Sequence, residues 1–209
     1  MKISILLLLL VTAAPGSCKQ SDEQDMTKET IANADLPVHN DMMESMTLSA
    51  NKMNNVIITG DYDFDYANNM IIHHQMAIDM STVEIEKGKD LKIVNIAKGI
   101  AAAQAIEIRE LQQFLKNYIK SKNDGQLSNS DKITFEMKQM MSQIQTQKMT
   151  NETDHDFVTM MIPHHQSAVA MANDELIYGK QASLKELSRN IIEDQTFEIN
   201  EFKNWQAKK

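Results

Sequence analysis

The hydrophobic and polar positions after residue 40 follow the period of a helix. Between about residues 91 and 120, apolar side chains recur every three or four positions and share one face. The same spacing returns between about residues 183 and 207, and no stretch alternates as a half-buried strand would. Glycine and proline are scarce in this region. The pattern therefore predicts an all-α domain.

The pattern also occurs twice. A shift of 91 positions places His73 on His164, and the match continues on both sides without a gap. Other matched pairs are Asp63/Asp154, Asp65/Asp156, Glu84/Glu175, Gly88/Gly179, Ile100/Ile191, Gln104/Gln195, Glu107/Glu198 and Phe114/Trp205. An ungapped match of this length indicates the duplication of one structural unit.

Each copy predicts a hairpin of two helices. Asp63 and Asp154 are suitable N-caps for the first helices, which end before Gly88 and Gly179. We expect both glycines to adopt the left-handed conformation that often closes a helix. Two such hairpins pack most simply as an antiparallel four-helix bundle. A methionine-rich amphipathic segment precedes each hairpin, which predicts two extra flanking helices.

Composition sets the expected domain boundaries. Residues 1–17 hold Lys2, an apolar run and small residues directly before Cys18, as in a lipoprotein-type signal peptide. Lipidation of Cys18, which is the only cysteine, would anchor the chain to a bacterial membrane. The alternative is an ordinary signal peptide. Either leader predicts export to the periplasm or cell envelope. The expected segments are a flexible tether at 18–40, repeat one at 41–120, a linker at 121–130 and repeat two at 131–209.

The charge of the chain excludes one class of partner. Its formal net charge is −8, and aromatic residues make up only 5% of it. Phosphate backbones are bound by clustered Lys and Arg, and single-stranded bases stack on aromatic side chains. We therefore expect no nucleic-acid partner.

The candidate chemistry lies in the hexapeptides at 70–75 and 161–166, which differ only where Ile72 replaces Pro163. Each contains two adjacent histidines and a methionine, and imidazole and thioether are ligands that soft transition metals prefer. At about 100° per residue, both histidine pairs straddle the apolar face and point into the bundle. The predicted metal ligands are His73, His74, His164, His165, Met70 and Met161.

The second helix of each hairpin is expected to place polar side chains next to the histidines. Counting back from the turn places Gln104 level with His74, and Glu107 one helical turn further along. Gln195 and Glu198 hold the same places in the second copy. A ligating histidine usually donates its other N–H to such an acceptor. The sequence thus predicts one polar layer in each hairpin.

The remaining methionines are weaker candidates. Met80 lies about 9 Å along the helix from His74, and Met171 lies equally far from His165. We therefore expect both to fill the core, as methionine commonly does. A separate accessory metal site is possible before the first hairpin, at His39, Met42, Met43 and Met46.

These motifs resemble a known family. The pattern Asp-x-x-Phe/Tyr, Met-Ile-x-His-His-Gln-x-Ala-x-x-Met, glycine and Gln-x-x-Glu-Ile occurs at 63–108 and 154–199. It is similar to that of the bacterial domain-of-unknown-function 305 family, although Ile72 stands where that family typically has proline. The resemblance implies secreted proteins with a ferritin-like bundle of two similar hairpins. It also implies periplasmic copper binding in support of copper resistance, which is described for some relatives.

Three functions fit these residues. The first is a non-catalytic, extracytoplasmic metal-binding protein that buffers copper, with Cu(I) favoured and another transition metal possible. The second is a metal-free structural or interaction module of the envelope. The third is a di-iron carboxylate oxidase, which is disfavoured because such centres use Glu-x-x-His, and neither histidine pair has a glutamate three residues before it.

Overall fold

The computed structural model describes residues 40–53, 55–119 and 127–209, in which there are six helices and no strand. The all-α prediction is confirmed. The helices are α1 (Asp41–Met53), α2 (Tyr62–Lys87), α3 (Leu91–Asn117), α4 (Leu127–Gln145), α5 (Thr153–Tyr178) and α6 (Ala182–Gln206). None of these six helices is long and apolar enough to cross a bilayer. The predicted leader, Cys18 and His39 lie outside the described residues.

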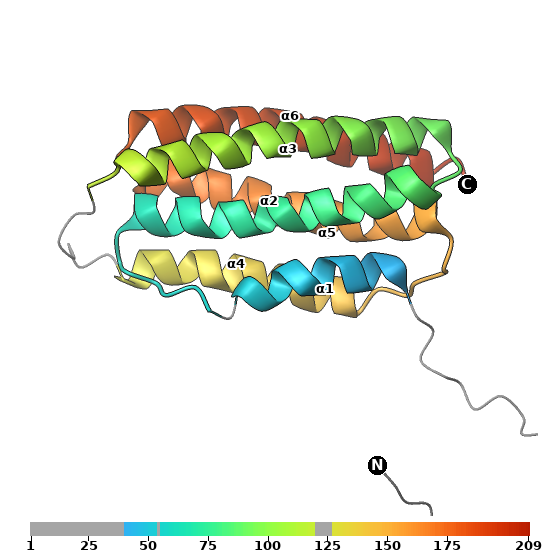
Figure 1. The fold of residues 1–209 in the computed structure, drawn as a ribbon, viewed down its shortest axis with the longest axis horizontal. Helices are drawn as coiled ribbons and strands as arrows, with labels where there is room; N and C mark the ends of the chain where they lie inside the picture. The colour runs from blue at the N-terminus through green and yellow to red at the C-terminus, as the bar shows by residue number, and fades with distance from the viewer. Residues whose placement is uncertain (1–39, 54, 120–126) are drawn as a thin grey trace, which may run out of the picture. The chain divides into compact units, whose positions relative to one another are not determined.

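The helices form three tiers (Figure 1). α2 and α5 run antiparallel in the middle tier, and each forms a hairpin with the helix that follows it, α3 or α6. These four helices are the predicted bundle of two duplicated hairpins. α1 and α4, the expected methionine-rich helices, cover the opposite side of α2 and α5. Both hairpin motifs therefore lie at the centre of the molecule, between two covering layers.

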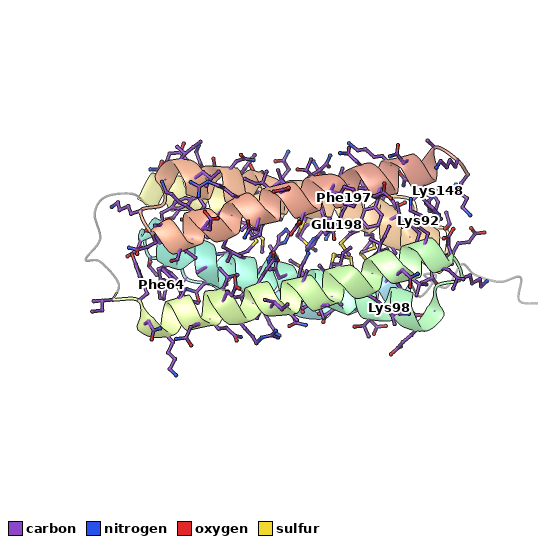
Figure 2. All side chains as sticks on the ribbon, turned by 90° about the horizontal axis from the view of Figure 1, so that it is seen from above. Phe64, Lys92, Lys98, Lys148, Phe197 and Glu198 are labelled. Carbon is purple, nitrogen blue, oxygen red and sulfur yellow. The ribbon has the colours of Figure 1, made fainter. Side chains whose placement is uncertain are left out.

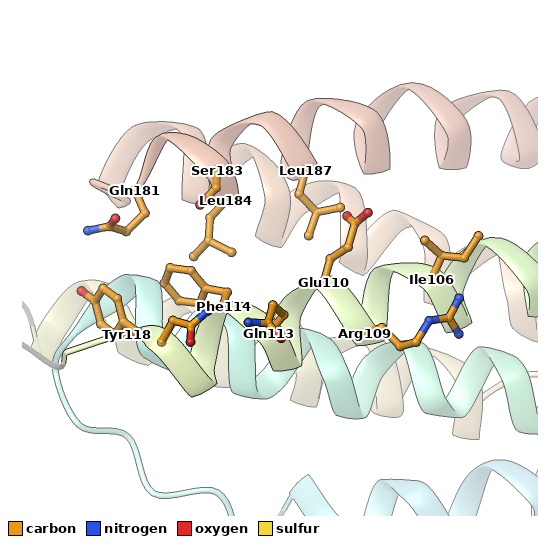
Figure 3. Close-up of a pocket in the computed structure, with 11 residues that line it drawn as sticks. Ile106, Arg109, Glu110, Gln113, Phe114, Tyr118, Gln181, Ser183, Leu184 and Leu187 are labelled. Atoms are coloured by element: carbon orange, nitrogen blue, oxygen red, sulfur yellow. The ribbon is translucent and has the colours of Figure 1, made fainter.

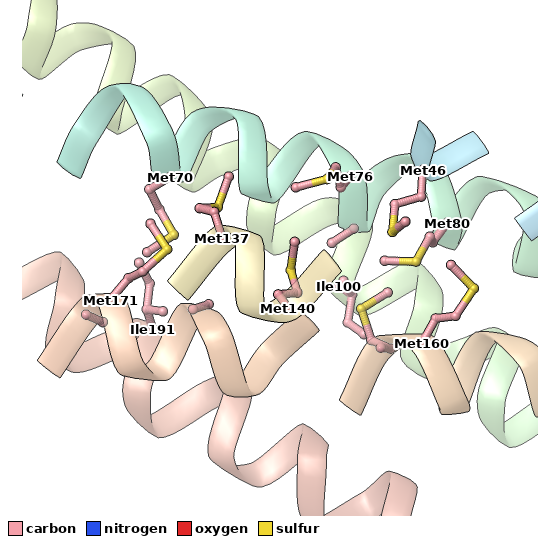
Figure 4. Packing of buried hydrophobic residues seen from close by; sticks show 14 of the residues in the cluster. Met46, Met70, Met76, Met80, Ile100, Met137, Met140, Met160, Met171 and Ile191 are labelled. Carbon is pink, nitrogen blue, oxygen red and sulfur yellow. The ribbon is translucent and has the colours of Figure 1, made fainter. Parts of the chain in front are cut away.

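Methionine fills much of the core between the tiers. Met46 of α1, Met80 of α2 and Met160 of α5 are all fully buried in one part of it (Figure 4). Met137 and Met140 of α4 extend into the same cluster. The unbranched thioether adapts to irregular gaps, which suits a core between helices of unequal length. Most methionines are thus accounted for by packing.

The predicted linker at 121–130 extends too far, because α4 begins at Leu127. Serine and asparagine favour the first turn of a helix as well as loops. Asn129 and Ser130 belong to such a turn, and Ser130 is fully buried. Composition alone could not separate these two uses of the same residues.

The N-cap prediction was wrong in position. The helices are preceded by Asp61 and Glu152, and the side chain of Asp61 accepts a hydrogen bond from the backbone N–H of Phe64. Asp63 and Asp154 instead cap the hairpin turn of the other repeat. Asp63 Oδ1 accepts the backbone N–H groups of Lys180 and Gln181, and Asp154 Oδ1 those of Lys89 and Asp90, each at 2.9 Å. The repeats are therefore joined at both ends of the bundle.

A buried glutamate faces each of these aspartates. Glu84 faces Asp154, and Glu175 faces Asp63, although neither contact has the alignment of a regular hydrogen bond. Burial, together with the facing aspartate, raises the pKa of each glutamate to about 9. Both glutamates therefore carry a proton at neutral pH. We call Glu84 with Asp154, and Glu175 with Asp63, the two carboxyl pairs.

The glycines at the two turns leave space for the buried glutamates of the carboxyl pairs, and neither adopts a chain-reversing, left-handed conformation. Gly88 and Gly179 are extended, each with a φ of −64°, so the expected left-handed conformation was wrong. A Cβ on Gly88 would lie 2.2 Å from Oε1 of Glu84, and one on Gly179 would lie 2.0 Å from Oε1 of Glu175. Glycine is required here because the buried carboxyl group occupies the space of a side chain.

Replacement of these glycines tests that explanation. Gly88→Ala is expected to lower the free energy of unfolding by about 1–3 kcal/mol, because the methyl group displaces Glu84. Gly99→Ala is the matched control: Gly99 is exposed within α3, and an added Cβ meets nothing within 4 Å. It should raise stability by about 1 kcal/mol, through helix propensity alone. Urea denaturation of both variants provides the measurement, and equal effects would contradict the explanation.

Candidate metal centre

The four predicted histidines are fully buried where α2 crosses α5. The rings of His73 and His164 lie 3.8 Å apart between centroids, and the adjacent rings of His74 and His165 flank them at 6.3 and 5.9 Å. The expectation of one polar layer in each hairpin therefore needs correction. Because α2 and α5 are antiparallel and cross at these residues, the two layers meet as one. We call these four side chains the histidine layer.

One hydrogen bond fixes the state of His164. Its Nε2 donates to the backbone carbonyl of His73 at 2.9 Å, so Nδ1 of the neutral ring carries a lone pair. Among the described residues, that Nδ1 has no hydrogen-bond partner, and neither ring nitrogen of His73 has one. Buried polar atoms without partners are rare and destabilising. A neutral imidazole has one lone-pair nitrogen, so His73 and His164 each offer one nitrogen that can bind a metal, and the two rings are in contact.

The predicted glutamates contact the outer histidines. His74 Nε2 lies 2.9 Å from Glu107 Oε2, and His165 Nε2 lies 2.8 Å from Glu198 Oε2. These contacts have ion-pair distances but lack the alignment of a hydrogen bond. The side chains of Glu107 and Glu198 are 12% and 20% exposed, whereas the histidines are fully buried. Each glutamate thus lies between solvent and a histidine.

The predicted glutamines are also buried. Gln104 and Gln195 are 2% and 3% exposed, and neither amide group finds a hydrogen-bond partner within the described part of the chain. A buried unsatisfied amide costs about 1–3 kcal/mol. The sequence analysis expected these side chains in the interior, where they increase the number of unsatisfied polar groups.

His73 and His164 are held in the neutral state. Burial lowers the pKa of His73 well below its ordinary value, and the nearby rings of His164, His74 and His165 lower it further. Burial and the neighbouring His165 likewise lower the pKa of His164. A neutral imidazole is the form that binds a metal, because protonation occupies the lone pair. His73 and His164 are therefore ready to accept a cation at neutral pH.

The methionines beside the layer include one that the sequence analysis set aside. Met70 and Met161 are fully buried, as expected. Met171 of α5 extends toward Met70 of α2, so that two thioethers face each other across the repeats (Figure 4). The sequence analysis excluded Met171 as a metal ligand because it lies too far along α5 from His165. The antiparallel contact between α2 and α5 instead brings it close to Met70 of the other repeat. Of the expected accessory site, Met42 and Met46 are buried in the core and Met43 is half-buried.

The residues present fit a soft metal better than a hard one. In the described ranges, no three His, Asp or Glu side chains are arranged to hold a metal as they stand. The layer instead offers unpartnered imidazole nitrogens beside buried thioethers. This donor set favours Cu(I), which accepts few ligands and prefers nitrogen and sulfur.

A groove on the outer face approaches the histidine layer without reaching it. It has a volume of ≈ 860 Å³ and runs between α3 and α6, from Gln181 and Tyr118 at the end of the bundle to Ile106 (Figure 3). None of the four histidines lines it. Its inner end is Ile106, which directly precedes Glu107 in α3.

Comparison with known proteins agrees with the repeated motif. The profile of the family described as domain of unknown function (DUF305) matches residues 63–206. That range includes both hairpins and the whole histidine layer. Among curated proteins, no match to this chain was found.

Solved structures share the fold. CopM in a silver-bound form is 27% identical and has a TM-score of 0.54, with 70% of this chain and 95% of CopM covered. CopM in a Cu(I)-bound form is 27% identical with a TM-score of 0.52, covering 70% and 96%. A secreted DUF305 protein from Streptomyces coelicolor is 22% identical with a TM-score of 0.55, covering 72% and 94%.

Proposed function

The chain belongs to the DUF305 family, and from this premise we propose that it is a non-catalytic, extracytoplasmic protein that binds and buffers copper. The proposed ligands are imidazole nitrogens of His73, His74, His164 and His165, with the sulfurs of Met70 and Met161. Gln104, Glu107, Gln195 and Glu198 would orient these ligands. Cys18 would carry the lipid anchor.

One observation carries the proposal. The two copies of one motif bring four histidines together in the core, where the unsatisfied ring nitrogens of His73 and His164 destabilise the metal-free fold. A structural network would be expected to satisfy its polar groups, whereas a ligand site holds lone pairs ready. CopM has been solved with Cu(I), Cu(II) and silver, which supports copper as the cargo.

Competition for Cu(I) tests the proposal. The purified protein should remove Cu(I) from a chromogenic chelator, and His73→Asn with His164→Asn should weaken its affinity on the order of a hundredfold or more. His155→Asn is the matched control, because His155 stands at the start of α5 with its side chain 39% exposed. An affinity unchanged in the double variant would overturn the site, and bound iron with oxygen consumption would favour the di-iron alternative.

A further inference from the structure

The histidine layer meets solvent through two carboxylates. Glu107 of α3 and Glu198 of α6 are partly exposed on one side and contact buried histidines on the other. Figure 2 shows Glu198 at the seam between α3 and α6, directly above the middle tier. Both contacts come from matched positions of the two repeats, so the seam brings the two carboxylates to the same face.

A third acidic residue lies near them. Asp194 of α6 is exposed and stands one helical turn before Glu198, and its pKa is raised by partial loss of hydration and then by the negative charges of Glu107, Glu198 and Glu193. Glu107 belongs to α3, and Asp194, Glu198 and Glu193 belong to α6. Three of these acidic side chains, one from α3 and two from adjacent turns of α6, therefore lie along the seam. We call Glu107, Asp194 and Glu198 the acidic seam.

A second, independent observation shows what the acidic seam faces. His74 and His165 are fully buried, and within the described residues their Nδ1 atoms have no hydrogen-bond partner. Each contacts a seam glutamate directly through Nε2. Gln195, the neighbour of Asp194 in α6, is equally buried and unpartnered. Buried histidine nitrogens without hydrogen-bond partners therefore lie directly behind the two seam carboxylates.

We propose that the acidic seam is the route by which a soft monovalent cation reaches the histidine layer, with Glu107 and Glu198 as its transfer ligands. This inference rests on the proposed function. Converging carboxylates raise the local concentration of a cation and can speed its association by about 10–10³-fold. Carboxylate is a hard donor that holds Cu(I) weakly, whereas imidazole and thioether hold it well. The cation therefore passes inward, from oxygen to nitrogen and sulfur.

Association and dissociation rates separate this route from the site itself. We choose Ag⁺ as a redox-stable substitute for Cu(I), mix it rapidly with the full protein, and measure protein-bound metal after a rapid quench. Glu107→Gln with Glu198→Gln should slow association at least tenfold at low ionic strength. Asp194 contacts no histidine within the described part of the chain, so Asp194→Asn should slow association without changing the rate of release into excess chelator.

Salt and a matched variant complete the test. The difference in association rate between the wild type and the seam variants should shrink in about 1 M salt, because screening shortens the Debye length to about 3 Å. Glu86→Gln with Glu186→Gln removes the same charge from exposed positions of α2 and α6 and should leave the association rate unchanged. A seam variant no slower than this control would overturn the route while leaving the proposed function intact. A wild-type protein that takes up no Ag⁺ or Cu(I) would instead contradict the proposed function.

Discussion

Raising the pH from about 7.5 to 9 is expected to lower the free energy of unfolding of this protein by up to about 4 kcal/mol. The cause is the two carboxyl pairs. Glu84 and Glu175 have pKa values near 9 in the folded protein, where burial and a facing aspartate disfavour their charge. The unfolded chain releases both protons near the ordinary value of 4.5. Each group then costs about 1.4 kcal/mol per pH unit.

The sign follows from which state keeps the proton. A glutamate with a raised folded-state pKa stabilises the fold fully below 4.5, and this contribution is lost as the pH rises toward 9. Besides Asp154, Asp90 also raises the pKa of Glu84. Glu175 is surrounded by Asp63, Asp61 and Lys185, of which only the lysine opposes the rise. Both pairs therefore act in the same direction.

Urea denaturation at several pH values measures this loss. Glu84→Gln with Glu175→Gln keeps the shape of both side chains but cannot ionise, so its stability should be nearly flat across the same range. Glu110→Gln with Glu186→Gln changes two exposed glutamates and should keep the wild-type slope. If the glutamine variant at the buried positions falls as steeply as the wild type, the carboxyl pairs are ionised already and the explanation is wrong.

The sequence predicts most of this architecture because duplication doubles every signal. The shift of 91 residues relates His73 to His164, and the structure places the two side by side in equivalent helices. The helix ends before Gly88 and Gly179 were located correctly. Periodicity also placed Gln104 and Gln195 in the interior. Helix ends and buried positions can be predicted because they follow from the local sequence pattern, and the same pattern occurs in both repeats.

The failures share a physical cause, which is contact between the copies. Asp63 and Asp154 have the local signature of N-caps, yet each caps a turn of the opposite repeat. Gly88 has the local signature of a left-handed cap, yet a carboxyl group determines its identity. Met171 lies too far from the histidines of its own helix but faces Met70 across the interface. Reasoning within one hairpin cannot see partners supplied by the other.

Replacing His73 with leucine should make the metal-free protein more stable, by about 1–3 kcal/mol at neutral pH. Neither ring nitrogen of His73 has a hydrogen-bond partner among the described residues, so the fold bears the cost of dehydrating both. Leucine removes that cost and fills a similar volume against the ring of His164. The same change should abolish the stabilisation that Cu(I) gives the wild type, about 2.7 kcal/mol at a hundred times Kd.

Lowering the pH should enlarge the difference in stability between His73→Leu and the wild type. The folded-state pKa of His73 is lowered, so its contribution is present above the ordinary value of 6.5 and is lost as the pH falls below it. His73→Leu escapes this loss and should gain about 1.4 kcal/mol on the wild type for each pH unit below 6.5. His155→Leu, at the exposed start of α5, should show neither effect. A metal-free His73→Leu protein less stable than the wild type would mean that His73 holds the core together, as in a structural module. If the metal-free variant is more stable than the wild type and Cu(I) does not stabilise it further, His73 lowers the stability of the fold and serves to bind the metal.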